Sequence, residues 1–478
     1  MRTGVDIEGF PFPDMLGSTL LENFWLRSWT RETYLWNTEV VDRNPANYAN
    51  RLQYFDLLRT TAKTASGKDK DEFHFSQPTA DYLEQRNSAP TAGYGASYGF
   101  ISSTPPRDIR IQYTEPGSPA ADQVMGVTNL PRGARILQVD GVDLVNANTQ
   151  AQINTLNNGL FPAAAGEMHT FVVRDDGSAL DRTVMLISDD IATSSVNKVS
   201  IISTATGDVG YALINTFSPF ASEADIVDAI TTMDNAGVSD AILDLRYNGG
   251  GLVAVSAQLG YMIAGNAQTS GKTFEALQFN AAAGNRDPVT GEINSPVPFI
   301  KTALGFSLPN GTPLPSLNLN RVFILTTGET CSASESVING LRGVNVNVVL
   351  IGGTTCGKPF GFYPEDNCGE TYYTIQFRGV NDKDFGDYTD GFAPQNSSDA
   401  FSVKAPGCVV ADDFSHELGD EAEALLAAAL NYRATSSCPA VPVMSAEARI
   451  AASTSEVQIA ITPPRNIMDS NRDMKLPN

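Results

Sequence analysis

The sequence predicts a multidomain α/β protein, and three patterns along the chain lead to this fold class. The chain has 478 residues, a length that accommodates about three domains. Beyond residue 200, short apolar segments alternate with segments of helical periodicity, which is typical of a parallel sheet with crossover helices. Residues 90–190 show short strands between turns, and residues 16–60 show an apolar stripe at helical spacing.

The first 88 residues are expected to form an N-terminal helical region. Their apolar side chains recur near helical spacing and include all three tryptophans of the chain. A packed aromatic core explains these side chains better than an aromatic binding site. Residues 62–72 are polar and charged, and they predict a linker.

Residues 89–192 are expected to form a small β domain. Ile109–Tyr113 alternates in the manner of a strand, and residues 133–143 predict a hairpin that turns at Asp140-Gly141. A second hairpin is predicted between residues 169–174 and 182–186.

Residues 193–440 are expected to form the α/β core, followed by an extended tail over 441–478. Ser222 with Asp225 predicts the start of a helix that stops at Gly237. Buried strands are predicted at 209–215, 241–245, 322–325 and 346–352, and further helices at 333–342 and 418–432.

Composition and charge exclude several classes of function. Hydrophobic residues make up 42% and charged residues 18% of the chain, which is ordinary for a protein with buried cores. The formal charge of −22 argues against nucleic acid and anionic membrane surfaces as partners. No apolar run is long enough to cross a bilayer, so no integral membrane segment is expected. The polar start has no apolar signal region, so either the protein is intracellular or its signal has been removed.

All five cysteines lie in the last third of the chain. No Cys-x-x-Cys pair occurs, and no metal or other cofactor is expected. The clustering favours disulfides and therefore an oxidising, extracytoplasmic compartment, whereas five free thiols in a cytosolic enzyme is the alternative. Cys356 with Cys368, and Cys408 with Cys438, are the expected pairs.

Three segments that could carry chemistry, residues 244–251, 330–335 and 354–358, each follow a predicted parallel strand. Parallel strands joined by crossovers end at one edge of their sheet, and ligands bind open α/β sheets at that edge. Ser332 and Lys358 are separated by one helix and one strand, a single crossover. If the two strands are neighbours, the two side chains come within reach of each other.

A serine beside a lysine points to nucleophilic catalysis. Ser332 begins a predicted helix, where free N–H groups favour a developing oxyanion. A serine hydroxyl needs a base. His74, His169 and His416 adjoin none of the three segments, so Lys358 is the candidate base.

Lys358 can act as a base only if the pKa of its amine falls from its usual value of about 10.4. Burial among Pro359, Phe360 and Phe362 would lower it. Gly249–Gly251 can supply further N–H groups, because glycine permits the required backbone angles.

Each segment also has a purely structural interpretation. Ser332-Ala-Ser-Glu335 fits a capping box at a helix start. A Gly-Lys pair after a strand is often a turn with an exposed lysine, and three glycines often form a flexible turn. All three segments lie at one predicted sheet edge, and this combination favours the catalytic interpretation over the structural one.

At these residues the chain resembles the C-terminal-processing (tail-specific) serine peptidases. The family's Asp-Leu-Arg strand end with Asn and a Gly pair is matched by Asp244–Gly251, its Ser-Ala-Ser-Glu by Ser332–Glu335, and its Gly-Lys by Gly357-Lys358. The resemblance implies a core of the ClpP/crotonase type and a PDZ domain over residues 89–192. Within that domain Ser97–Phe100 is similar to the loop that captures a terminal carboxylate.

The resemblance also implies roles for individual residues. Ser332 would be the nucleophile and Lys358 the general base, and the N–H groups of Ala333 and of Gly250 or Gly251 would form the oxyanion hole. Tyr98, Gly99 and Phe100 would bind the peptide. Many members carry Gln or Glu one turn after the lysine to orient it, and here that position is Phe362.

The sequence therefore predicts a serine endopeptidase that cleaves unfolded or C-terminally recognised polypeptides, with no cofactor and with an undetermined oligomeric state. Two alternatives stay open. One is a catalytically weak or inactive peptide-binding protein of the same fold, suggested by Phe362. The other is a crotonase-like acyl-CoA enzyme, which would need carboxylate acid/base groups and no PDZ domain.

Overall fold

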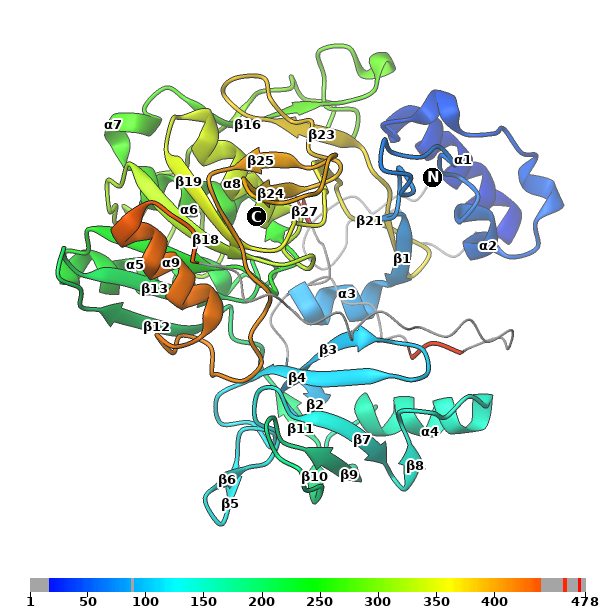
Figure 1. The fold of residues 1–478 in the computed structure, drawn as a ribbon. Helices are drawn as coiled ribbons and strands as arrows, with labels where there is room; N and C mark the ends of the chain where they lie inside the picture. Colours follow the sequence, from blue (N-terminus) through cyan, green and yellow to red (C-terminus); the bar gives the residue numbers. More distant parts are fainter. Residues whose placement is uncertain (1–16, 87–89, 440–458, 462–471, 474–478) are drawn as a thin grey trace. The chain divides into compact units, whose positions relative to one another are not determined.

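The structure is a computed structural model that describes residues 17–86, 90–439, 459–461 and 472–473. The chain divides into two units, each described here by itself (Figure 1). Unit 1 comprises Met1–Ser88, Lys198–Val409 and Ile467–Asn478, and unit 2 comprises Ala89–Asn197 and Val410–Asn466. Among the described residues, no helix combines the length and the apolar character needed to cross a bilayer.

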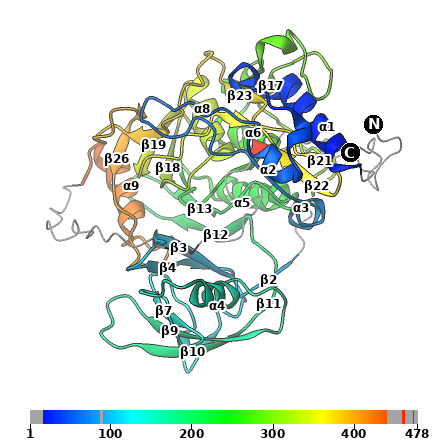
Figure 2. The ribbon, with the colours of Figure 1, turned by 90° about the vertical axis from the view of Figure 1, so that its right-hand side faces the viewer.

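Unit 1 is built on a six-stranded sheet with the order β12-β13-β14-β18-β19-β26. The five strands from β13 to β26 run parallel, and Figure 2 shows β13, β18, β19 and β26 following one another across the sheet. Their residues are buried almost throughout, as expected for a parallel sheet covered on both faces. The strands are β12 (Val196–Ile202), β13 (Val209–Ile214), β14 (Asp240–Asp244), β18 (Arg321–Thr326), β19 (Asn347–Gly352) and β26 (Gly407–Val409).

Helices connect the parallel strands, which confirms the alternation predicted from the sequence. α5 (Ser222–Ala236) joins β13 to β14, and α8 (Ala333–Gly343) joins β18 to β19. α5 stops where predicted, because Gly237 adopts the left-handed conformation with φ 64°. Its predicted cap is wrong, since Ser222 is already helical and its hydroxyl donates to Pro219 O. The long loop between β14 and β18 carries β15 (Gly251–Leu252), α6 (Val253–Ala264), α7 (Asn266–Thr269), β16 (Thr273–Gln278) and β17 (Val297–Pro298).

The N-terminal region does not form a unit of its own. β1 (Phe75–Pro78) pairs antiparallel with β22 (Glu370–Tyr373), so the region completes unit 1. Its tryptophans pack in or against buried clusters, as predicted: Trp29 is buried, and the partly buried Trp25 stacks on it at 5.3 Å. It contains α1 (Thr19–Thr33), α2 (Arg51–Phe55) and α3 (Thr79–Arg86).

Small sheets in addition to the six-stranded one complete unit 1. An aromatic cluster joins Tyr34 and Tyr82 to Phe360, Phe362 and Tyr373. This cluster shows that the segment following Lys358 packs on the N-terminal region. The remaining strands of unit 1 are β20 (Phe360–Gly361), β21 (Glu365–Asn367), β23 (Phe377–Val380), β24 (Phe392–Pro394), β25 (Val403–Ala405) and β27 (Arg472–Asp473).

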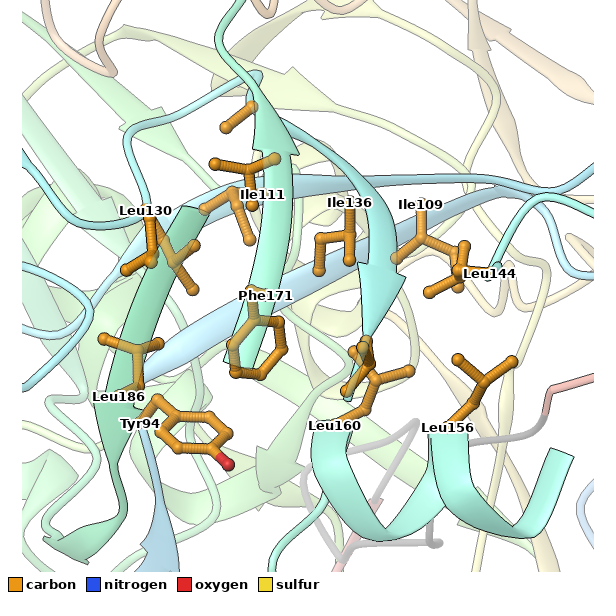
Figure 3. Packing of buried hydrophobic residues seen from close by; sticks show 14 of the residues in the cluster. Tyr94, Ile109, Ile111, Leu130, Ile136, Leu144, Leu156, Leu160, Phe171 and Leu186 are labelled. Carbon is orange, nitrogen blue, oxygen red and sulfur yellow. The ribbon is translucent and has the colours of Figure 1, made fainter. Parts of the chain in front are cut away.

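Unit 2 contains a sheet with the order β10-β9-β7-β4-β3, to which β8 adds beside β7. Both predicted hairpins are present, and the turn between β7 and β8 places Asp140 and Gly141 at φ 49° and 77°. Figure 3 shows how Leu156 and Leu160 of the α4 helix pack with Phe171 and the other buried side chains of the sheet. The main elements are β3 (Ala96–Ser102), β4 (Asp108–Thr114), β7 (Arg135–Val139), β8 (Val142–Asp143), α4 (Gln150–Leu160), β9 (Met168–Arg174) and β10 (Arg182–Ile187).

Short strands and one helix complete unit 2. They are β2 (Thr91–Gly93), β5 (Gln123–Val124), β6 (Val127–Thr128), β11 (Asp189–Ile191) and α9 (Ala424–Thr435). α9 begins six residues later than the sequence predicts, after the Glu423 side chain caps its first turn. Most of the predicted tail, 441–478, lies outside the described residues.

The disulfide pattern corrects one prediction. Cys331 is bonded to Cys356, and Cys368 is a buried thiol outside this disulfide, so the expected Cys356–Cys368 pair is wrong. Cys368 lies in the tight turn between β21 and β22, where its neighbours pair across the hairpin. Cys408 and Cys438 are disulfide-bonded as well.

Candidate active site

Three loops leave the same edge of the unit 1 sheet. β14 ends at Asp244, β18 at Thr326 and β19 at Gly352, and these three strands are neighbours. Ser332 and Lys358 therefore follow adjacent strands joined by the single crossover α8, as predicted. The edge is the carboxyl end of a parallel sheet, where α/β folds bind their ligands.

Hydrogen bonds tie the three loops together. The Thr330 hydroxyl donates to Leu245 O at 2.8 Å, and Cys331 N donates to Asn248 O at 3.0 Å. Cys356 N donates to Thr330 O at 3.1 Å. The turn that carries Ser332 is thus bonded to the loops on both sides of it.

A buried ion pair fixes the loop after β14. Asp244 and Arg246 are both fully buried, with Nε to Oδ1 at 2.9 Å, and the Tyr211 hydroxyl donates to Asp244 Oδ2 at 2.7 Å. Thr327 adds a hydrogen bond to Arg246 O from the next loop. A buried charge is tolerated only when it is paired and hydrogen-bonded, so these groups hold one arrangement of the loop.

Ser332 has an unusual backbone conformation, with φ 60° and ψ −113°. A residue with a Cβ atom rarely adopts a positive φ, and such strain concentrates at functional sites. The Ser332 side chain is completely buried, and its hydroxyl has no hydrogen-bond partner among the described residues. The hydroxyl therefore does not act as a helix cap here, whereas its backbone N–H donates to Glu335.

The Glu335 carboxylate joins the serine turn to the lysine loop. It accepts hydrogen bonds from Ser332 N at 3.0 Å, Lys358 N at 2.8 Å, Gly357 N at 2.9 Å and the Thr355 hydroxyl. Burial raises the pKa of Glu335, and these hydrogen bonds act in the opposite direction. The spacing of Ser332 and Glu335 predicted a capping box. Nothing in the sequence indicated that Glu335 also accepts hydrogen bonds from the lysine loop.

The Lys358 side chain is fully buried against aromatic rings. Its Nζ lies 4.5 Å from the ring centre of Phe73 and 4.6 Å from that of Phe362. Phe362, at the position where Gln or Glu was expected, thus contacts the amine through its ring face. Desolvation disfavours the ammonium form, whereas the ring faces favour it. The contribution of Phe73 was not foreseen, because no sequence signal links it to Lys358.

The candidate oxyanion donors lie at the same edge of the sheet. Ala333 is the first residue of α8, so its N–H has no partner within the helix. Gly250 N donates to Asn248 Oδ1 at 2.9 Å, so this N–H is engaged within its own loop. Gly251 has φ 136°, and a Cβ there would lie 2.2 Å from Phe217 C, so only glycine fits.

The Cys331–Cys356 disulfide is a covalent link between the two halves of the site. Cys331 precedes Ser332, and Cys356 lies two residues before Lys358, with a Cα–Cα distance of 5.2 Å. Both sulfur atoms lie near the Glu335 carboxylate, but they are bonded to each other and are not free thiolate ligands. A cavity of about 360 Å³, with polar lining residues that include Lys68 and Asp390, lies beside Cys356.

The histidines make other contacts. His74 is buried against Phe55 O and Thr374, His169 pairs with Asp140, and His416 pairs with Asp413. None of these histidine contacts involves the Ser332 hydroxyl.

Tyr98, Gly99 and Phe100 lie in unit 2, within strand β3 rather than in a loop before it. β3 is the last strand on one side of its sheet, so one edge of it is not paired within that sheet. Tyr98 and Phe100 pack against the buried core of unit 2.

A parallel α/β sheet with a strained, buried serine at the start of a crossover helix defines a serine hydrolase, and the buried lysine loop beside it fits that class. Residues 208–362, which include Ser332 and Lys358, match the model of Peptidase family S41. The chain carries a domain of this family, that of the C-terminal processing proteases, and it is a serine-type peptidase.

A solved structure supports this fold, and a second similar one is given for comparison. A structure assigned to the S41 proteases from Bacteroides fragilis NCTC 9343 superposes with a TM-score of 0.62 and 21% identity, over 89% of this chain and 100% of that one. The photosystem II D1 C-terminal processing protease gives a TM-score of 0.46 and 18% identity, over 82% of this chain and 94% of that one. No curated protein sequence matches the chain.

Proposed function

We propose that the protein is a serine endopeptidase in which Ser332 is the nucleophile and Lys358 the general base. The observation that carries this proposal is the burial of both side chains on loops of adjacent strands, joined through the Glu335 carboxylate. A buried amine and a buried hydroxyl at one sheet edge match the needs of acyl transfer.

The reaction follows from these positions. Ser332 Oγ attacks the peptide carbonyl while Lys358 Nζ takes its proton, and the N–H groups of Ala333 and Gly251 receive the oxyanion. The lysine then protonates the leaving amine, and a water that it activates hydrolyses the acyl-enzyme. The Ser332 hydroxyl is unbonded in the structure, which fits catalytic hydrogen bonds that shorten when substrate binds.

The proposed substrates are unfolded polypeptides and polypeptides with a free C-terminus. Unit 2 would act as a PDZ domain and bind such a terminus along β3, with Tyr98, Gly99 and Phe100 in contact with it. Support comes from the unpaired edge of β3 and from the single helix α4 packed on the sheet.

Hydrolysis of a reduced, unfolded protein tests the proposal. Wild type should cleave it, and Ser332→Ala should lose about 10³-fold or more of that rate. A fluorescent peptide with a free C-terminus should still bind Ser332→Ala. Equal hydrolysis by the two proteins would remove Ser332 from the mechanism, and binding without any hydrolysis would favour the inactive peptide-binding protein.

We also place the protein in an extracytoplasmic, oxidising compartment. The Cys331–Cys356 disulfide supports this location, because such bonds are rare in reducing compartments. Alkylation of native material before and after reduction tests it, and a full set of free thiols would contradict it.

A further inference from the structure

Two short pieces of the C-terminal segment are described, residues 459–461 and 472–473: the first packs on the core cluster of unit 2, and the second pairs with β15, which contains Gly251. The first piece belongs to unit 2 and the second to unit 1. The two contacts are independent observations, and each is considered within its own unit.

In unit 1, β27 (Arg472–Asp473), labelled in Figure 1, adds a parallel strand to β15. Gly251 pairs with Arg472, and Leu252 pairs with Asp473. The opposite edge of β15 is already bonded to Phe217. β27 therefore covers the remaining edge of the strand that contains the candidate oxyanion glycine.

The proposed function brings a substrate to this same edge. If the reacting carbonyl lies at the Gly251 N–H, the adjoining peptide is expected to run along β15. Addition of an extended peptide to an open strand edge is a common mode of recognition, in which main-chain hydrogen bonds provide affinity. The C-terminal strand and a substrate strand cannot occupy this edge together.

In unit 2, Ile459 and Ile461 bind in an extended manner. Ile461 is 1% exposed within the buried core cluster of unit 2, Ile459 packs against that cluster, and Ala460 between them is exposed. Ile459 N donates to Asn148 Oδ1 at 2.9 Å, and Ile461 N donates to Ser103 O at 3.1 Å. Alternate burial with main-chain hydrogen bonds is how a domain holds a peptide strand.

These attachment points lie next to the elements proposed to bind peptides. Ser103 directly follows β3, and Asn148 lies two residues before α4. Tyr98 and Phe100 of β3 pack against the same cluster as Ile461. Residues 459–461 thus lie beside elements of the candidate peptide surface of unit 2.

We propose that the C-terminal segment is an intrachain peptide ligand: Ile459 and Ile461 anchor it on unit 2, and residues 472–473 cover the substrate edge of β15. A chain that carries this segment is then self-inhibited. The inhibitory part of this proposal rests on the proposed peptidase function. A tethered segment has an effective concentration in the millimolar range, so even a two-residue strand pairing is populated.

A chain that ends at Asn466 tests the contact with β15. It keeps Ile459 and Ile461 but lacks β27, so kcat/KM on an unfolded protein substrate should rise about tenfold, mainly through KM. A synthetic peptide of residues 467–478 should inhibit this shortened chain competitively, and a scrambled peptide should not. Equal kcat/KM for the two chains, or no inhibition by the peptide, would overturn the proposal.

A binding measurement separates this proposal from the proposed function. Fluorescence anisotropy of a labelled 467–478 peptide, measured with the shortened chain carrying Ser332→Ala, needs no catalysis. The peptide should bind, and unlabelled unfolded substrate should displace it. If neither chain hydrolyses substrate, the proposed peptidase function is wrong. The anisotropy measurement still decides whether the segment binds, and absence of binding contradicts the present proposal.

The anchor is tested by Ile461→Asp with Ala460→Asp as its matched control. A buried carboxylate releases the segment from unit 2, so Ile461→Asp should raise kcat/KM towards the value of the shortened chain. Ala460 is exposed, and its variant should behave as wild type. Ile461→Ala serves if thermal unfolding shows that the aspartate disrupts unit 2. If Ile461→Ala in a folded chain leaves kcat/KM unchanged, the anchor is wrong.

Discussion

Ser332 and Lys358 are both completely shielded from solvent, yet the chain secures them in different ways. At Ser332 the backbone is held: its N–H is bonded to Glu335, its φ is positive, and its hydroxyl has no partner among the described residues. At Lys358 the side chain is held, with its amine between the rings of Phe73 and Phe362. The hydroxyl is therefore positioned through the main chain, whereas the amine is positioned by its apolar surroundings.

Replacement of the amine should give the largest effect. Lys358→Met keeps the length and apolar stem of the side chain but removes the proton acceptor, so activity should fall about 10³-fold. Methionine suits an aromatic environment, so the unfolding temperature should not fall. Hydrolysis rates on a peptide substrate measure the activity, and thermal unfolding measures the stability. Activity near the wild-type level would show that Lys358 is not the base.

Glu335 connects the two sides of the comparison, and Glu335→Gln should have the next largest effect. The amide N–H₂ group replaces either Oε2, which accepts from Ser332 N and Lys358 N, or Oε1, which accepts from Gly357 N and the Thr355 hydroxyl. In either orientation at least one N–H donor loses its acceptor, so the network loosens. Misplacement of a catalytic group by about 1 Å costs about 10²-fold in rate.

The expected loss in Glu335→Gln is in kcat rather than in KM, as measured by steady-state kinetics. Glu329→Gln, an exposed carboxylate of the same loop, is the matched control and should behave as wild type. A loss confined to KM would assign Glu335 to substrate binding instead.

Reduction of the Cys331–Cys356 disulfide should have a moderate effect. The bond fixes the serine turn to the lysine loop, while the hydrogen bonds of Glu335 remain after reduction. A dithiol reductant, with access to Cys356 from the adjoining cavity, should lower kcat about tenfold and reversibly. The test uses a Cys368→Ser background, which removes the Cys368 thiol and prevents exchange. A Cys331→Ser/Cys356→Ser chain that retains its sensitivity to reductant would point to another disulfide.

The smallest expected effect is on the pH dependence of stability. Burial raises the pKa of Glu335, whereas the unfolded carboxyl group ionises near 4.5. Between pH 4.5 and the folded pKa, the Glu335 carboxyl group is therefore protonated in the folded chain and ionised in the unfolded chain. Stability from this group is fully present below pH 4.5 and is lost as pH rises through the folded pKa.

Glutamine does not titrate, so the unfolding temperature of wild type relative to Glu335→Gln should decrease as pH rises above 4.5. A difference that is constant across this range would show that the hydrogen bonds to the carboxylate cancel its desolvation.

The elements that could be predicted are those with a repeating pattern. Short apolar runs between helical segments indicate parallel strands, so the shared edge of the three loops followed from the sequence. That β18 and β19 are direct neighbours was left open by the sequence and is seen in the structure. The hairpin at Asp140-Gly141 followed from its turn residues in the same way.

The contacts that could not be predicted join residues far apart in the chain. Glu335 accepts from Gly357 and Lys358, and no local pattern reveals such partners. The pairing of five cysteines depends on which strands are neighbours, so proximity in sequence favoured Cys368 while the fold selected Cys331. Phe73 reaches Lys358 only because the N-terminal region packs into unit 1.

The backbone of Ser332 has a consequence for how this chain can be altered. A side chain at φ 60° is held at a cost of about 1–3 kcal/mol, which glycine would not incur. Ser332→Gly should therefore unfold at a higher temperature than wild type while being inert. At this position glycine gives the more stable protein and serine gives the active one. A screen that selects for thermal stability alone will therefore lose the nucleophile.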